Sequence, residues 1–231
     1  MDEKLIDTNH QTNTIITITV ISIIWAVILF VYIYHKVINV NTKNKIGFKF
    51  ENYLNNQINE LVKKTEFSFV KGGVYRINNK MYELDSMLIS NSLVVVIEYK
   101  YYLGKLEGDA ASDELLLSSN KRKRKTIFNP IVQNEKHLNH VLKIIGKNVP
   151  IASVIVFPNE LSIKIENKPD HVLLVLENKV SKCIEMLNEQ AKALPQSIKK
   201  SDIVNAFDIY KIATSKEKIQ FKKNIKNKNR R

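Results

Sequence analysis

The sequence lacks features that would place it in several common classes of protein. One cysteine is present, Cys183, so no disulfide can form within the chain. His137 and His140 are spaced as H-x-x-H, but no cysteine or acidic residue is spaced to complete a zinc site, which we therefore exclude. No internal repeat is present, and aromatic residues do not alternate with basic ones in the manner of single-strand-binding surfaces. Disulfide-rich and zinc-binding folds are thus excluded.

Charged residues are absent from residues 15–34, which read IITITVISIIWAVILFVYIY. A helix needs about 20 mostly apolar residues to cross a hydrocarbon core of about 30 Å. A cleaved signal peptide would need a positive n-region and a small-residue cleavage site, and a buried soluble helix would show a polar face. Neither is present, so the sequence predicts a transmembrane helix at residues 15–35 after a short N-terminal segment, 1–14.

Basic residues lie mainly on the C-terminal side of this apolar run. Lys36, Lys43 and Lys45 follow it, whereas only Lys4 precedes it. By the positive-inside rule this asymmetry predicts a single-pass protein of the cell membrane whose large domain lies in the cytoplasm. The reverse topology, with the domain outside the cell, is the alternative. Residues 36–46 are expected to be a polar linker.

The whole chain carries 36 Lys and Arg against 23 Asp and Glu, a formal net charge of +13. An excess of this size favours polyanionic partners, either nucleic acid phosphates or the headgroups of anionic lipids. Charge alone does not choose between them.

The remaining sequence alternates helical and strand patterns over residues 47–213, which we expect to form one α/β domain with a mixed central sheet and helices packed around it. The predicted helices are 47–64, about 130–145, 179–192 and 201–213. The predicted strands are two short ones around a Gly72-Gly73 turn, a hairpin at 81–89 and 93–100, and buried strands at 152–157 and 171–177. Residues 104–126 are expected to be a polar loop, and residues 214–231 a basic disordered tail.

The residues with the clearest chemical meaning are Asp85, Glu98 and Lys100. Glu98 and Lys100 are two residues apart at the end of a strand, so they point to the same face, and Asp85 lies on the preceding strand of the hairpin. Burying two carboxylates without compensation is costly. A divalent cation such as Mg²⁺ or Mn²⁺, held by Asp85 and Glu98, would offset that cost and could serve phosphodiester hydrolysis. The alternative is an ordinary ion-paired strand edge.

Further motifs flank these three residues. They are, in chain order, Gly47-x-x-x-Glu51, Asp85, Glu98-Tyr99-Lys100 with Gly104 and Gly108 after it, and Asn129-Pro130-x-x-Gln133. Taken together they resemble the NERD (nuclease-related) domain, a branch of the PD-(D/E)xK nuclease superfamily, over residues 47–158. The resemblance implies a restriction-endonuclease-like α/β/α fold and a Mg²⁺-dependent nuclease.

The resemblance also implies individual roles. Asp85 and Glu98 would be metal ligands, Lys100 the catalytic lysine, and Glu51 the first-helix acid that completes the site or positions a water. Gln133 would face the site from the later helix. Asn129 would cap that helix and contact substrate, and His137, one turn beyond Gln133, would also reach substrate. The chain departs from the family in two respects: no tryptophan follows Glu98-Tyr99-Lys100, and Asn91 or Ser92 replaces a turn glycine.

A basic run precedes the predicted helix at residue 130. Its members are Lys121, Arg122, Lys123, Arg124 and Lys125. They are expected to contact nucleic acid, with contact to an anionic membrane surface as the alternative.

These observations predict a membrane-anchored, divalent-metal-dependent nuclease that acts on DNA. The alternative from another class is a non-catalytic module that holds nucleic acid or a protein at the membrane.

Overall fold

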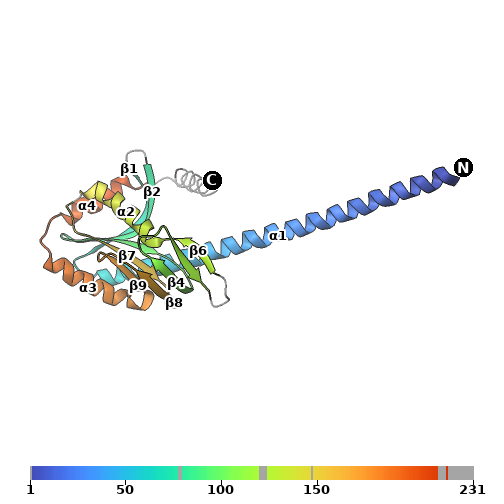
Figure 1. Ribbon diagram of the computed structural model, residues 1–231. Coiled ribbons are helices and arrows are strands. Elements are labelled where there is room, and N and C mark those ends of the chain that lie inside the picture. The colour runs from blue at the N-terminus through green and yellow to red at the C-terminus, as the bar shows by residue number, and fades with distance from the viewer. Residues whose placement is uncertain (1, 78–79, 120–123, 147, 213–216, 218–231) are drawn as a thin grey trace. The chain divides into compact units, whose positions relative to one another are not determined.

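The structure is a computed structural model that describes residues 2–77, 80–119, 124–146, 148–212 and Glu217 (Figure 1). For residues 2–17 and 35–44 only the backbone is described. The chain divides into two units, residues 1–48 and residues 49–231. The basic tail predicted at 214–231 lies outside the described residues, apart from Glu217.

The first helix, α1, extends from Asp2 to Val62. Residues 36–46, expected to be a linker, are therefore helical, and the helix predicted at 47–64 is the last part of α1. Among the residues whose side chains the structure describes, no helix is both long and apolar enough to cross a membrane. The transmembrane helix predicted at 15–35 is therefore not found among these residues, and its apolar run is part of the continuous helix α1. The cell-membrane location stays a prediction.

A five-stranded mixed sheet forms the centre of the second unit, in the order β1-β2-β3-β7-β9. Strands β1, β2 and β3 are antiparallel neighbours, whereas β7 runs parallel to both β3 and β9. The strands are β1 (Ser68–Ile77), β2 (Lys80–Ile89), β3 (Val94–Tyr99), β7 (Ile151–Phe157) and β9 (Val172–Leu176). The hairpin and the two later strands predicted from the sequence are confirmed. The prediction of two short strands around a Gly72-Gly73 turn was wrong, because β1 continues through both glycines.

Helices cover both faces of this sheet, as Figure 1 shows for α2 and α4 on one side and α3 on the other. They are α2 (Pro130–Ile145), the short helix η1 (Glu177–Lys179), α3 (Val180–Ala193) and α4 (Lys200–Tyr210). Alternate residues of β3 divide between the two faces. Val95 and Ile97 pack with α3 and with the α1 stripe that includes Leu54 and Ile58. Val94 and Val96 pack against α2 and α4.

A second sheet, in the order β6-β5-β4-β8, occupies the region expected to be a polar loop. Its strands are β4 (Gly104–Asp109), β5 (Glu114–Ser118), β6 (Arg124–Phe128) and β8 (Leu161–Glu166). One face buries Leu106, Leu115 and Leu117 against Ile155 and Phe157 of β7, whereas the other exposes Leu116 among polar and charged residues. The α/β class is thus confirmed, but with two sheets in place of one.

Asn134 fastens α2 to the central sheet. Its Nδ2 donates hydrogen bonds to the Val96 carbonyl (3.1 Å) and to the Ser153 hydroxyl (2.9 Å), and it lies 3.4 Å from the Val154 carbonyl. The side chain is fully buried. One amide therefore connects α2 to both β3 and β7.

We expect Asn134→Ala to lower the free energy of unfolding by about 1–3 kcal/mol, because buried acceptors on two strands lose their donor. Urea denaturation would measure the change. Asn139 of the same helix is exposed and bonds only the Glu135 carbonyl, so Asn139→Ala is the matched control and should change stability by less than about 0.5 kcal/mol. Equal losses in both variants would contradict this role of Asn134.

Candidate active site

Glu98 lies at the centre of the candidate site. All six residues of β3 are buried, and Glu98 is only 2% exposed. By alternation it points to the same face as Val94 and Val96, toward α2. A carboxylate at this position must be compensated by its neighbours.

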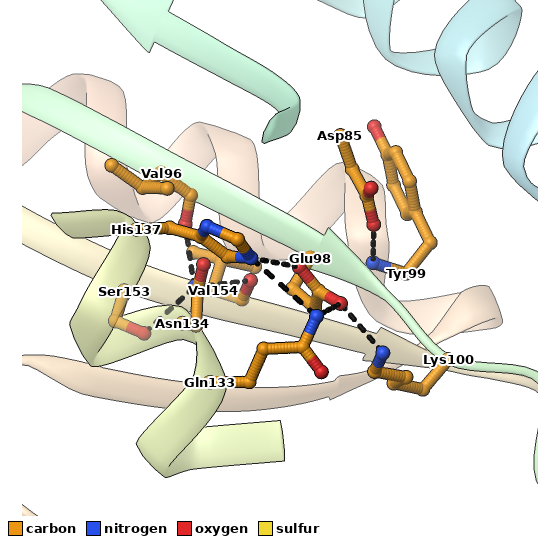
Figure 2. A network of polar contacts seen from close by, with 10 residues as sticks. All are labelled: Asp85, Val96, Glu98, Tyr99, Lys100, Gln133, Asn134, His137, Ser153 and Val154. Atoms are coloured by element: carbon orange, nitrogen blue, oxygen red, sulfur yellow. Dashed lines mark hydrogen bonds and ion pairs between the residues drawn. The ribbon is translucent and has the colours of Figure 1, made fainter. Parts of the chain in front are cut away.

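Three side chains surround this carboxylate (Figure 2). Lys100 Nζ lies 2.7 Å from Glu98 Oε1, and Gln133 Nε2 donates a hydrogen bond of 2.8 Å to the same oxygen. His137 Nε2 lies 3.4 Å from Glu98 Oε2 and 3.4 Å from Gln133 Nε2. Oε2 accepts no hydrogen bond from the described residues. One oxygen of Glu98 is thus well satisfied and the other is not.

The electrostatics of Glu98 and Lys100 follow from this geometry. Burial alone would raise the pKa of Glu98, but the positive charge of Lys100 and the close approach of the His137 ring outweigh it, so the net shift is downward. Burial alone would lower the pKa of Lys100, and its attraction to Glu98 reverses that shift. The two groups therefore hold each other in their charged forms.

Asp85 approaches from the neighbouring strand β2. Its Oδ2 accepts a hydrogen bond of 2.9 Å from the backbone N–H of Tyr99. Burial of the carboxyl group raises the pKa of Asp85 well above its ordinary value, and the nearby charges of Glu98 and Glu51 raise it further. Glu98 of β3 and Glu51 of α1 thus both disfavour the charged form of Asp85.

The hairpin that carries Asp85 is constrained in its turn and along its β1 edge. The turn between β2 and β3, at the opposite end of the hairpin from Asp85, is closed by the Ser90 hydroxyl, which accepts hydrogen bonds from the N–H groups of Ser92 (3.2 Å) and Leu93 (2.9 Å). This hydroxyl explains how the turn forms without the glycine usual in the family. At the β1 edge, Gly72 passes so close to Asp85 that an added Cβ would clash with the Asp85 carbonyl oxygen.

The family model of the nuclease-related domain, NERD, matches residues 46–158. Residues 46–158 are a nuclease-related domain. This family belongs to the PD-(D/E)xK-like nuclease superfamily. The match extends from α1 to the end of β7 and includes every side chain around Glu98 described above.

The nuclease-related domain also has a curated relative. An uncharacterized protein of Bacillus anthracis is 25% identical over 172 residues, which are 71% of this chain and 78% of that protein. No solved structure matches the chain significantly.

Within the nuclease-related domain the structure brings together Asp85, Glu98, Lys100, Gln133 and His137, and it places Glu51 within electrostatic range of Asp85. Their proposed chemical roles stay predictions. The resemblance gave the residues, but the sequence did not show that Gln133 and Lys100 meet on one oxygen of Glu98.

Asn129 does not fit the predicted contact with substrate. Its side chain is completely buried, with Oδ1 accepting from the Ile131 N–H (2.9 Å) and Nδ2 donating to the carbonyls of Ala110 (3.0 Å) and Ser112 (2.7 Å). Every hydrogen-bonding group of the amide is thus used inside the protein. Asn129 caps α2 and fastens it to the loop between β4 and β5.

The structure describes two of the five residues of the basic run at 121–125. Lys121, Arg122 and Lys123 lie outside the described residues. Arg124 and Lys125 belong to β6 and are exposed, with Arg124 opposite Ser118 of β5. Contact of this run with nucleic acid therefore stays a prediction.

The residues of the site fit a divalent cation of the Mg²⁺ type. Glu98 Oε2 is a buried acceptor that receives no hydrogen bond from the described residues, and Asp85 offers a second carboxylate from the adjacent strand. Mg²⁺ commonly uses one or two carboxylates and keeps several waters. Among the described residues, no three His, Cys, Asp or Glu side chains gather in a way that could hold a metal by themselves. The donor set therefore suits Mg²⁺ or Mn²⁺, with waters or substrate completing the coordination.

Sequence reasoning missed a buried polar network beneath the site, formed by Asn55, Ser86 and the hydroxyl of Tyr99. A signal was present for Asn55, which is polar yet occupies the apolar stripe of α1 between Leu54 and Ile58, one helical turn after Glu51. Tyr99 gave no signal, because an aromatic residue in a buried strand is ordinarily read as core.

Asp85→Asn tests the repulsion among the acids. Because the folded protein keeps the Asp85 proton to a higher pH than the unfolded chain does, the free energy of unfolding decreases as pH rises above the ordinary pKa, about 3.9. The neutral amide escapes this loss. We expect Asp85→Asn to melt at a higher temperature than wild type at pH 7 without metal, with a smaller difference near pH 4. Exposed Asp170→Asn is the control, and a difference independent of pH would contradict the expectation.

Lys100→Met leaves the buried Glu98 carboxylate without its cation. We expect a loss of about 3 kcal/mol in the free energy of unfolding, at the low end for a broken buried pair, since Gln133 still bonds Glu98. Glu98→Gln in the same chain should restore much of that loss. The exposed pair Lys105–Glu107, also 2.7 Å apart, supplies the matched control: Lys105→Met should cost less than about 1 kcal/mol. Urea denaturation of wild type, Lys100→Met, the Lys100→Met/Glu98→Gln double variant and Lys105→Met would measure these free energies of unfolding.

Proposed function

We propose that this protein is a divalent-metal-dependent phosphodiesterase that cleaves nucleic acid, with DNA as the substrate. The observation that carries the proposal is the buried Glu98 carboxylate, paired with Lys100 beside Asp85, within a nuclease-related domain. Two carboxylates and one amine at one end of a sheet match what phosphodiester hydrolysis needs, namely a metal site and a positive group near the phosphate.

Asp85 and Glu98 would hold the metal, which would supply Lewis-acid polarisation of the phosphate and a water activated at neutral pH. Lys100 keeps its positive charge because Glu98 raises its pKa. Its side chain is still 20% exposed. From this position the ammonium group can stabilise negative charge that develops on phosphate oxygens.

Gln133 and His137 act on the same carboxylate from α2. The amide of Gln133 fixes the rotamer of Glu98 through Oε1 and leaves Oε2 for the metal. His137 lies 3.4 Å from Glu98 Oε2, and 15% of its side chain is exposed. It is the residue of α2 best placed to contact a bound phosphate or its leaving group.

Charge supports a polyanionic substrate. The whole chain carries a formal net charge of +13. Arg124 and Lys125, the described residues of the basic run, are exposed. Electrostatic attraction to phosphates would supply affinity without sequence specificity, and it would weaken as salt rises.

Cleavage of supercoiled and linear DNA by the full-length chain tests the proposal, with Mg²⁺ or Mn²⁺ compared against EDTA and an RNA substrate alongside. We expect metal-dependent cleavage that falls about 100-fold or more in Lys100→Ala and in Asp85→Asn. Lys105→Ala removes an exposed lysine outside the site and should retain the activity of wild type.

Activity that persists equally in Lys100→Ala and Asp85→Asn would come from another nuclease and would refute the assigned site. DNA retention without cutting, unchanged in both variants, would identify a binding module instead. Preference for RNA would correct the substrate and keep the chemistry.

A further inference from the structure

Tyr99 connects the candidate site to the first helix by two separate parts of the residue. Its backbone N–H donates to Asp85 Oδ2 (2.9 Å), as Figure 2 shows. Its side chain points to the opposite face of the sheet, where the hydroxyl donates to Asn55 Oδ1 (3.0 Å). One residue thus contacts β2 on the side of the site and α1 on the other side.

The hydroxyl of Tyr99 is fully engaged. Ser86 Oγ lies 2.6 Å from it. Because a phenol has one hydrogen and donates it to Asn55, the Ser86 hydroxyl must be the donor in this second contact. The three polar groups form a buried chain from β2 through β3 to α1, in a region otherwise occupied by apolar side chains such as Leu54 and Ile97.

Asn55 lies one helical turn after Glu51, on the same face of α1. Glu51 is half-buried, and its charge acts on Asp85 and on Tyr99. The bond from Tyr99 to Asn55 therefore holds the turn of α1 that follows Glu51, the acid of this helix whose charge acts on Asp85.

We propose that Tyr99 is a positioning residue that sets the place of Glu51 beside Asp85 through its hydrogen bond to Asn55, and thereby sets the affinity for the divalent metal. The inference rests on the proposed function. The hydroxyl of Tyr99, the residue between Glu98 and Lys100, thus connects β3 to α1 and gives this position a role beyond packing.

A core tyrosine with a satisfied hydroxyl would explain the packing but not this arrangement. Phenylalanine would fill the same space, and an apolar residue at position 55 would remove the need for any polar group there. The polar chain instead reaches α1 one helical turn after Glu51, whose charge acts on Asp85. Residues that orient metal ligands typically contribute about 10- to 100-fold in affinity.

Mn²⁺ binding to the full-length chain tests the inference, measured by calorimetry for wild type, Tyr99→Phe, Glu51→Gln and the double variant. We expect Tyr99→Phe to weaken Mn²⁺ binding about 10-fold. We also expect this loss to disappear when Glu51 is already glutamine, since there is then no acid to position. Tyr75→Phe is the matched control, because Tyr75 is also fully buried but contacts Lys71 and Phe207 on the other face.

A loss that stays at full size in the Glu51→Gln background, or no loss, would overturn the inference, as would an equal loss in Tyr75→Phe. If wild type fails to bind Mn²⁺, the proposed function fails, and a metal-free measurement still decides the positioning. The melting temperatures of Glu51→Gln, Asp85→Asn and their double variant give the coupling between the two acids. That coupling should shrink in Tyr99→Phe, and an unchanged coupling would overturn the inference.

Discussion

The burial of one carboxylate governs the arrangement of this domain. Glu98 is almost completely removed from water near the end of β3, a strand whose six residues are all buried. An ion in such a place is tolerated only where charges and donors converge on it. Lys100, Gln133 and His137 come from the end of β3 and from α2. Asn129 at the start of α2 and Asn134 within it hold this helix on the sheet. The same placement of α2 brings Gln133 and His137 to the buried carboxylate of Glu98.

The sequence predicted well those parts that depend on local signals. Proline at position 130 marked the start of α2, and continuous apolar runs marked β3, β7 and β9. It failed in residues 104–126, because β4 and β5 each bury only one or two leucines and expose the rest to water, so their composition is that of a loop. β8 alternates apolar and polar residues from Leu161 to Glu166, a strand signal that was present and overlooked.

The candidate site was predicted residue by residue and not as an arrangement. Motif order supplied Glu51, Asp85, Glu98, Lys100 and Gln133. Which oxygen each donor contacts depends on rotamers and on the register of β2 against β3, and no motif encodes either. Asn129 shows the limit most clearly: a polar residue beside catalytic motifs was taken for a substrate contact, whereas its amide is consumed entirely by the fold. The apolar run at residues 15–34 likewise gave an anchor that the described helix does not show.

The close approach of β1 at Gly72 has a consequence for how this site can adapt. Leu84 and Asp85 present their carbonyl oxygens to Gly72 with no room for a side chain between the strands. The backbone of Asp85 therefore cannot shift toward β1 unless that strand moves with it. In the proposed nuclease, adjustment to the shape of a substrate falls to groups on other sides of the site, which include Gln133 and His137 of α2. Because the close approach involves backbone atoms, position 72 should stay glycine in relatives that keep this pairing of β1 with β2, whatever residue occupies position 85.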